Sequence, residues 1–87
     1  MSKFAVVLGD PTSHGGKVSS ASSSFELAGK KAALLNDTVT CPEHGPNRIT
    51  ECDASAYVEN GRGIVLHGFK TECGSVVIAT LQDMEVD

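Results

Sequence analysis

The sequence has few of the large side chains that fill a protein interior. Among its 87 residues there is no tryptophan, one tyrosine and three phenylalanines, whereas there are nine glycines. A chain of this length buries only about 60–65% of the surface that its unfolded form exposes, so a core of small aliphatic side chains is marginally stable. We therefore expect a further source of stability, which in so small a domain is a disulfide, a metal ion or a partner protein.

Long apolar runs and an excess of positive charge are also missing. The longest apolar stretches, residues 5–8 and 76–81, fall far short of the roughly 20 residues that a membrane-spanning helix needs. Seven Lys and Arg residues against eleven Asp and Glu residues give a net charge of −4, whereas a domain that binds nucleic acid is normally basic. The sequence therefore argues against stable insertion into a membrane and against a nucleic-acid partner.

The chain has three cysteines, which is an odd number, and no cleavable signal pattern in its first residues. A disulfide framework usually has an even number of cysteines in a secreted chain. Thiols beside histidines in a chain without a signal favour metal binding or simple burial over a disulfide. If the protein is exported, we expect it to use another route than a signal peptide.

Short apolar or β-branched runs alternate with turn signals, and helix signals are almost absent. This pattern predicts an all-β fold with short strands and many turns. The expected strands are residues 5–8, 32–35, 56–58, 64–66 and 76–78, and the expected turns are Gly9-Asp10-Pro11, Asn36-Asp37, Asn60-Gly61 and His67-Gly68. The serine-rich stretch at residues 19–24 is expected to be a solvated strand or loop.

The chain repeats itself three times, with copies that start at residues 5, 32 and 64. Each copy has four mostly apolar residues, a turn pair, a step that contains threonine, and a side chain able to bind metal. The last position is His14, Cys41 or Cys73; further on, Val18 aligns with Ile49 and Val76. Each copy is too small to bury a face alone, so three copies must pack around a common axis. We expect one pseudo-threefold domain over residues 1–80, with an acidic tail at 81–87.

The repeat brings the equivalent turns to one end of this body, and with them a set of metal-binding side chains. Zinc prefers four tetrahedral nitrogen and sulfur ligands, and the insertion of residues 42–48 directly after Cys41 adds a Cys-x-x-His spacing. His67 replaces the apolar residue of the other copies. Five residues compete for four places, and the sequence leaves open which of them bind: His14, Cys41, His44, His67 and Cys73. Cys52 lies outside the turns and is expected to be a buried small side chain.

Three motifs of this chain resemble PAAR-domain proteins. They are Gly9–Gly16, Cys41-Pro42-Glu43-His44-Gly45 and Leu66–Gly74, and the resemblance extends over residues 4–80. The chain departs from the Pro-Ala-Ala-Arg motif that names the family, because it has Lys31-Ala32-Ala33-Leu34 in one copy and Gly63-Ile64-Val65-Leu66 in a later one.

The resemblance implies a conical β-structure that caps the distal end of the trimeric VgrG spike of the bacterial type VI secretion system. Such a tip sharpens the spike for membrane penetration, carries or adapts effector proteins, and is not an enzyme. The resemblance also implies one structural zinc ion, bound by three histidines and one cysteine. In this chain these are His14, His44, His67 and Cys73, with Cys41 as the alternative cysteine. The expected stoichiometry is one tip per trimer, assembled in the cytoplasm and then exported by the secretion system.

Three other functions remain open at this point. A phage-type tail spike tip and a stand-alone zinc-binding module have the same sequence features. A small zinc hydrolase or deaminase requires a general acid or base beside the metal, and Glu43 is the carboxylate in that position. The His-Glu-x-x-His motif of zinc proteases and the signature of zinc deaminases are both missing, which argues against an enzyme.

Overall fold

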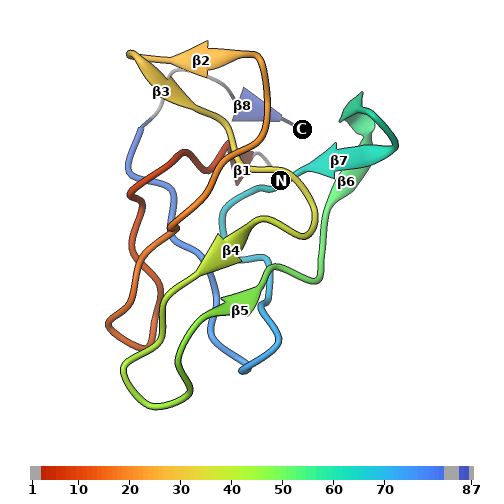
Figure 1. The fold of residues 1–87 in the computed structure, drawn as a ribbon. Helices are drawn as coiled ribbons and strands as arrows, with labels where there is room; N and C mark the ends of the chain where they lie inside the picture. The colour runs from red at the N-terminus through yellow and green to blue at the C-terminus, as the bar shows by residue number, and fades with distance from the viewer. Residues whose placement is uncertain (1–2, 82–84, 87) are drawn as a thin grey trace.

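The computed structural model of this chain describes residues 3–81 and 85–86. Its regular elements are short β-strands, and they pair antiparallel as β1 with β8, β2 with β3, β4 with β5, and β6 with β7 (Figure 1). Their bounds are β1 Lys3–Phe4, β2 Glu26–Leu27, β3 Lys30–Lys31, β4 Thr38–Val39, β5 Asn47–Arg48, β6 Asp53–Glu59, β7 Arg62–Ile64 and β8 Glu85–Val86. The predicted all-β class is confirmed. In the described residues, no helix is long and apolar enough to cross a membrane.

A closed ring of backbone hydrogen bonds joins the three repeats. The N–H of Val6 donates to the carbonyl of Val65, and the N–H of Val65 donates to the carbonyl of Ala33, both at 3.0 Å. The N–H of Ala33 donates back to the carbonyl of Val6 at 2.9 Å, which closes the ring. The three residues hold the same position in their repeats, so each repeat donates to one neighbour and accepts from the other. The predicted pseudo-threefold arrangement therefore exists at the level of the backbone.

The same cyclic pattern recurs above and below this ring. In each set, the N–H of the first residue of every pair donates to the carbonyl of the second, and the three pairs come from equivalent positions of the three repeats. The sets are Leu8 to Lys31, Leu35 to Gly63 and His67 to Phe4; Ser19 to Thr38, Thr50 to Lys70 and Ile78 to Pro11; Thr40 to Lys17, Glu72 to Arg48 and Ser13 to Val76. The hydrogen bonds also correct one alignment made from the sequence. Gly9, Asn36 and Gly68 donate to Val18, Ile49 and Val77, so Val77 and not Val76 is the third equivalent residue.

Within the apolar segments the structure has single bridges where we expected continuous strands. Ala5 pairs with Leu66 of one neighbouring repeat, whereas Val7 pairs with Ala32 of the other. A segment that winds around a threefold axis changes partner after two residues, so it forms no long ladder with either neighbour. The expected strand at 56–58 does lie within a regular element, β6.

The predicted turns are confirmed by their backbone angles. Gly9, Asn36 and Gly68 hold equivalent positions and have φ values of 89°, 71° and 86°. A positive φ at the third residue of a turn is the mark of type II, which favours glycine or asparagine there. The turn residues that follow, Asp10 and Asp37, are buried and accept the N–H groups of Val7 and Leu34 through Oδ2 at 2.9 and 2.8 Å. The third copy has Phe69 in this position.

The core is a column of aliphatic side chains along the threefold axis. Val6, Ala33 and Val65 form one layer, and the equivalent residues Val18, Ile49 and Val77 form the next; all six are at most 1% exposed. A layer built from three side chains that meet on an axis has no room for a large ring at its centre. This geometry explains why a chain with so few aromatic residues still has a packed core.

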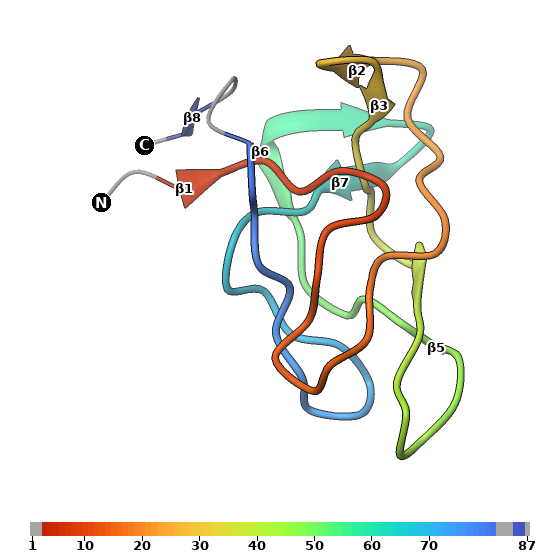
Figure 2. The same cartoon turned by 90° about the vertical axis from the view of Figure 1, so that its left-hand side faces the viewer.

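The hairpins β2–β3 and β6–β7 and the pair β1–β8 lie together at one end of the molecule, opposite the loops that contain residues 13–15, 41–45 and 72–74 (Figures 1 and 2). The two hairpins turn through Ala28-Gly29 and Asn60-Gly61, where all four φ values are positive, as in type I′ turns. The two ends of the chain provide a third antiparallel pair, β1 with β8. Of the predicted acidic tail, residues 82–84 and 87 lie outside the described residues, and the domain boundary at residue 80 stays a prediction.

The serine-rich stretch is more ordered than we expected from its composition. Ser20 and Ser22 donate their hydroxyls to the buried carboxylate of Asp37, while Ser23 and Ser24 donate to Glu59 of β6. Ser23 is fully buried. The stretch is therefore a connection between repeats that is held in place by the hydrogen bonds of its serine hydroxyls.

Candidate metal centre

Two turns of the same geometry present His14 and Cys73. In the first, the N–H of Thr12 donates to the carbonyl of Gly16 at 2.9 Å, and the N–H of Gly15 donates to the carbonyl of Thr12 at 3.2 Å. The turn from Thr71 to Ser75 has the same two bonds at 2.9 and 3.0 Å. In both, a glycine with φ near 86° follows the metal-binding residue, which is typical of a tight hairpin loop. His14 and Cys73 are therefore equivalent in structure as well as in sequence.

The middle repeat has a longer loop between β4 and β5, and this loop contributes two side chains. Cys41 holds the position equivalent to His14 and Cys73. The N–H of Gly45 donates to the carbonyl of Cys41 at 2.8 Å, and Gly45 has a φ of 73°. This reversal folds His44 back, so that its Nδ1 lies 3.4 Å from the Sγ of Cys41. The insertion thus supplies a fourth side chain that threefold repetition alone does not provide.

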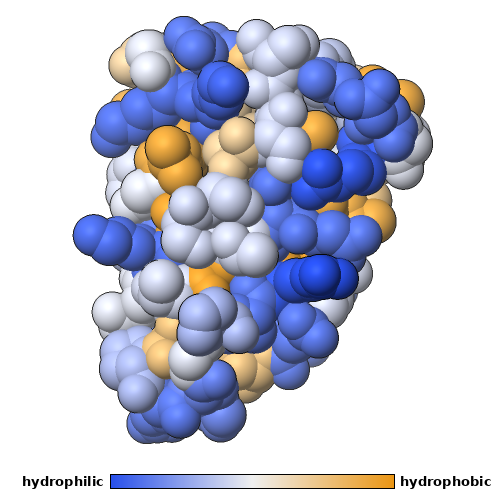
Figure 3. Space-filling model, viewed as in Figure 1, coloured by the Kyte–Doolittle hydropathy of each residue, from blue (hydrophilic) through white to orange (hydrophobic). Residues whose placement is uncertain are grey.

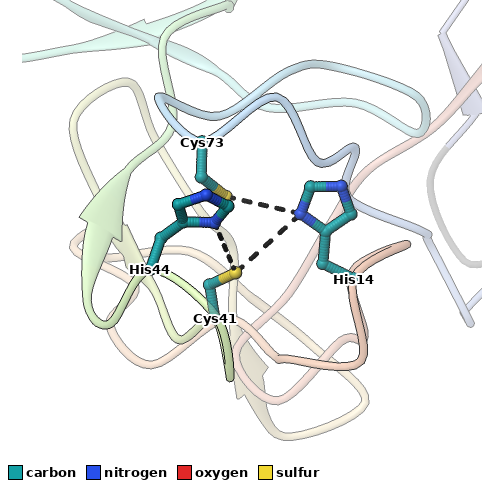
Figure 4. Close-up of side chains that lie close together, drawn as sticks. All are labelled: His14, Cys41, His44 and Cys73. Atoms are coloured by element: carbon teal, nitrogen blue, oxygen red, sulfur yellow. Dashed lines mark hydrogen bonds between the residues drawn. The ribbon is translucent and has the colours of Figure 1, made fainter.

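Four side chains converge at this end of the molecule: His14, Cys41, His44 and Cys73 (Figure 4). One donor atom from each lies within 4.8 Å of all the others. The Nδ1 of His14 is 3.8 Å from the Sγ of Cys41 and 3.7 Å from the Sγ of Cys73. Zinc–sulfur and zinc–nitrogen bonds of about 2.3 and 2.0 Å at tetrahedral angles separate sulfur from nitrogen by about 3.6 Å. The three sulfur–nitrogen distances fit this value, so the group matches the geometry of a tetrahedral metal site.

The electrostatics of the group suit a cation. The hydroxyls of Ser75 and Thr71, at 3.4 and 3.3 Å from its sulfur, and the nearby His14 lower the pKa of Cys73 to about 5. The hydrogen bond with Cys41, followed by that with Cys73, raises the pKa of His14 above its ordinary value. The thiolate is the form of cysteine that binds metal, and the lowered pKa of Cys73 favours this form at neutral pH before any metal is bound.

Close backbone packing supports the loops from behind. A Cβ atom added at Gly16 would lie 1.7 Å from the carbonyl oxygen of Thr40, the residue before Cys41. The hydroxyl of Thr40 also accepts the N–H of Lys17 at 3.0 Å. The first and second repeats therefore touch through their main chains just behind the metal-binding side chains, where there is no space for a hydrophobic core.

His67, which the resemblance assigned to the site, is not in this group, whereas Cys41 is. His67 is exposed at the type II turn of the third repeat, and its Nδ1 accepts the N–H of Ala79 at 3.1 Å. It stands where the other repeats have Leu8 and Leu35, six residues before the position that points into the group. The structure thus gathers two histidines and two cysteines, where the resemblance implied three and one.

Cys52 and Glu43 also lie outside the group. Cys52 is half-buried, and its Sγ packs against Gly63 of β7. A Cβ atom added at Gly63 would lie only 2.7 Å from this sulfur. Glu43 is exposed on the same loop as His44. All three cysteines are free thiols in this structure.

Comparison with protein families gives a match that covers most of the chain. The family model described as the PAAR motif matches residues 8–79, a range that contains all four side chains of the group. The chain belongs to the PAAR family. Members of this family are spike-tip modules of type VI secretion systems and sit on the VgrG spike. A search of curated proteins finds none that matches this PAAR chain.

The name-giving motif of PAAR proteins is altered here, but its two alanines keep a structural role. Ala32 and Ala33 are fully buried, and Ala33 belongs to the hydrogen-bonded ring on the axis. Ala33 donates and accepts the same backbone hydrogen bonds in this ring as Val6 and Val65 do in the other two repeats. The lysine and leucine that flank the alanines change the ends of the motif and leave this contact intact.

Proposed function

We propose that this PAAR domain binds one zinc ion through His14, Cys41, His44 and Cys73 and that the ion is structural. The sulfur–nitrogen spacing supports the proposal, and so does the donor set, because two thiolates with two imidazoles are typical of structural zinc. Four protein ligands leave no coordination position for a reactive water molecule. Bound zinc would tie together three turns from three repeats at a point where side-chain packing contributes little.

Elemental analysis of the purified full chain tests the metal directly. We expect close to one zinc per chain, lost on treatment with a strong chelator and accompanied by a lower melting temperature. The Cys52→Ser variant is the matched control, because Cys52 packs against Gly63 and should leave the zinc content unchanged. A protein that purifies without metal and melts at the same temperature with and without added zinc would refute a structural zinc ion.

We further propose that the chain caps the distal end of a trimeric VgrG-like spike, with one copy per trimer. The observation that carries this proposal is the closed ring of hydrogen bonds among Val6, Ala33 and Val65. It gives a single chain three similar sides around one axis, which is what a monomer needs to close the end of a threefold partner. The pairs β2–β3, β6–β7 and β1–β8 surround that axis at the end opposite the metal centre. In the described residues each is a sheet of two strands, which leaves an outer edge, at β2 and at β6, for a partner strand to pair with.

Native mass spectrometry of the mixed proteins measures this stoichiometry. We expect one PAAR chain for three VgrG chains. Three PAAR chains per trimer would refute the cap, and so would a complex that forms equally well after the hairpin β2–β3 is changed. A suitable change is the double substitution Lys30→Glu and Lys31→Glu, because both side chains are exposed on β3. The same two substitutions leave the metal centre untouched, so zinc content serves as the control for folding.

The remaining features of this function follow from the cap. The domain acts as a rigid point that sharpens the spike and carries or adapts effectors, and it has no catalytic role of its own. It is assembled in the cytoplasm and leaves the cell with the spike. An export assay that compares cells with and without a working type VI system tests this route: the protein should appear in the medium only when the system works.

A further inference from the structure

Two of the four side chains at the metal centre are thiols, and they come from equivalent turns of two neighbouring repeats. The Sγ atoms of Cys41 and Cys73 lie within 4.8 Å of each other. The imidazole of His14 lies beside the pair, with its Nδ1 at 3.8 Å from the Sγ of Cys41 and 3.7 Å from the Sγ of Cys73. A site with one thiol cannot form a disulfide within itself, whereas this site holds two neighbouring thiols.

We propose that Cys41 and Cys73 form a disulfide with each other when the site has lost its metal and a disulfide oxidant is present. The end of the molecule then has two alternative cross-links at one place, a zinc ion under reducing conditions and a disulfide under oxidising conditions. The inference rests on the proposed function only for the reduced state, in which zinc holds the thiolates.

The sulfur atoms need to approach each other by less than 3 Å to reach the bonding distance of about 2.05 Å. Cys41 is buried and Cys73 is half-buried, and each lies in a turn. The ring of His14 beside them is exposed, so it has room to rotate toward solvent as the sulfurs approach. The hydroxyls of Thr71 and Ser75 hold the Sγ of Cys73 only through long contacts of 3.3 and 3.4 Å. The disulfide therefore requires rotation of the two side chains together with a shift of the turns that carry them.

The third thiol is separated from this pair. Cys52 lies against Gly63, at the junction of β6 and β7, and does not belong to the group of converging side chains. The odd number of cysteines thus divides into one pair with a common site and one single residue that packs in the fold.

The chemistry is thiol–disulfide exchange with a small disulfide such as oxidised glutathione. The thiolate of Cys73, which is the more exposed of the two, attacks one sulfur of the oxidant and releases one glutathione thiolate. The thiolate of Cys41 then attacks the Sγ of Cys73 and releases the second glutathione thiolate. Two electrons pass from the protein sulfurs to the oxidant, and the released thiolates take protons from water. A thiolate bound to zinc is not free to attack, so the metal protects the pair.

The test uses the full-length chain with Cys52→Ser, so that only the pair can react. Metal is removed with a chelator, its loss is verified by elemental analysis, and oxidised glutathione is added. We expect intact mass spectrometry to show the loss of two hydrogen atoms without a glutathione adduct, and peptide mapping to link the Cys41 peptide to the Cys73 peptide. Glutathione adducts on both cysteines without a link, or two unreacted thiols, would overturn the proposal.

Two further arms complete the experiment. In the Cys52→Ser background, the Cys41→Ser and Cys73→Ser variants should each form a stable glutathione adduct on the one remaining thiol, because no second thiol resolves it. Addition of zinc before the oxidant should slow formation of the disulfide at least tenfold in the Cys52→Ser protein; equal rates with and without zinc would refute the alternation of the two cross-links. A chain that binds no zinc refutes the proposed metal but still gives a clear result in the metal-free arm, so the two failures are distinguishable.

Discussion

Substitution of His44 tests the ligand set more sharply than any other change, because the chain contains its own control. His44→Ala removes a side chain that lies in the group of four, whereas His67→Ala removes a histidine that is also exposed but lies outside it. The family resemblance assigns both residues to the metal, and the structure gathers only the first. The two variants should therefore behave differently in every measurement that depends on zinc.

The expected size of the effect follows from the number of ligands. Structural zinc contributes about 10–16 kcal/mol of apparent binding free energy in small zinc-binding peptides at neutral pH. An equal share among four ligands assigns about 2.5–4 kcal/mol to His44, which corresponds to a roughly 60- to 700-fold loss of zinc affinity. With zinc in excess, the free energy of unfolding falls by the same amount. For a domain of this size the melting temperature should then drop by roughly 10–30 °C.

His67→Ala has a smaller and different cost. The variant loses the hydrogen bond in which Nδ1 accepts the N–H of Ala79, an exposed contact of 3.1 Å. A bond of this kind contributes about 1 kcal/mol or less, so the melting temperature should change by only a few degrees. This change should persist in the presence of a chelator, because it does not involve the metal.

The assay is thermal unfolding of the wild type and both variants with excess zinc and with chelator, together with a competition titration for zinc affinity. The deficit of His44→Ala should disappear with chelator, because all three proteins are then metal-free. Normal zinc affinity in His44→Ala would refute the ligand set proposed here, whereas weak affinity in both variants would favour the set implied by the family, which contains both histidines.

Two other substitutions test the packing behind the site and the base of the molecule. Gly16→Ala should destabilise the protein by several kcal/mol and weaken zinc binding, because the new Cβ would lie 1.7 Å from a backbone oxygen. Gly9→Ala is the control, because that position has open space but a φ of 89°. In urea unfolding it should lower the free energy of unfolding by only about 1–2 kcal/mol, and it should keep full zinc content. The hydroxyl of Tyr57, at 2.7 Å, is the main reason why the pKa of Glu59 lies below its ordinary value of 4.5. A lowered carboxyl pKa stabilises the folded state above pH 4.5, and this stabilisation is lost as the pH falls through the folded-state pKa. The Tyr57→Phe variant should therefore lose less stability than the wild type when the pH is lowered below 4.5.

Internal repetition predicts three members of the group of converging side chains from the sequence alone. The aligned copies place His14, Cys41 and Cys73 at one position, and the structure brings these three together. The resemblance placed His67 among the ligands and kept Cys41 as the alternative cysteine, and no pattern in the residues distinguishes a histidine at a type II turn from a metal ligand. The decisive signal is positional: every repeat contributes the side chain that follows its threonine step, and the insertion adds one more.

The path of the chain around the axis is harder to predict than its class. Turn residues and short apolar runs specify an all-β fold, yet Ala5 and Val7 pair with different repeats because the segment winds around its neighbours. Local patterns predict that a residue is extended but not which partner it meets. The serine-rich stretch shows the same limit, because the partners of its hydroxyls, Asp37 and Glu59, are far away in sequence.

The insertion between β4 and β5 occurs in one repeat only, so it makes one side of an otherwise threefold molecule different from the other two. On the proposed trimeric partner, a cap with three similar sides can sit in three azimuths, and contacts that follow the threefold axis do not distinguish between them. The hairpins at the base are unequal, however: β6 has seven residues and β2 has two. The length of β6 is therefore the feature with which a partner could select one azimuth, and in that case the loop that contains His44 would point the same way on every assembled spike.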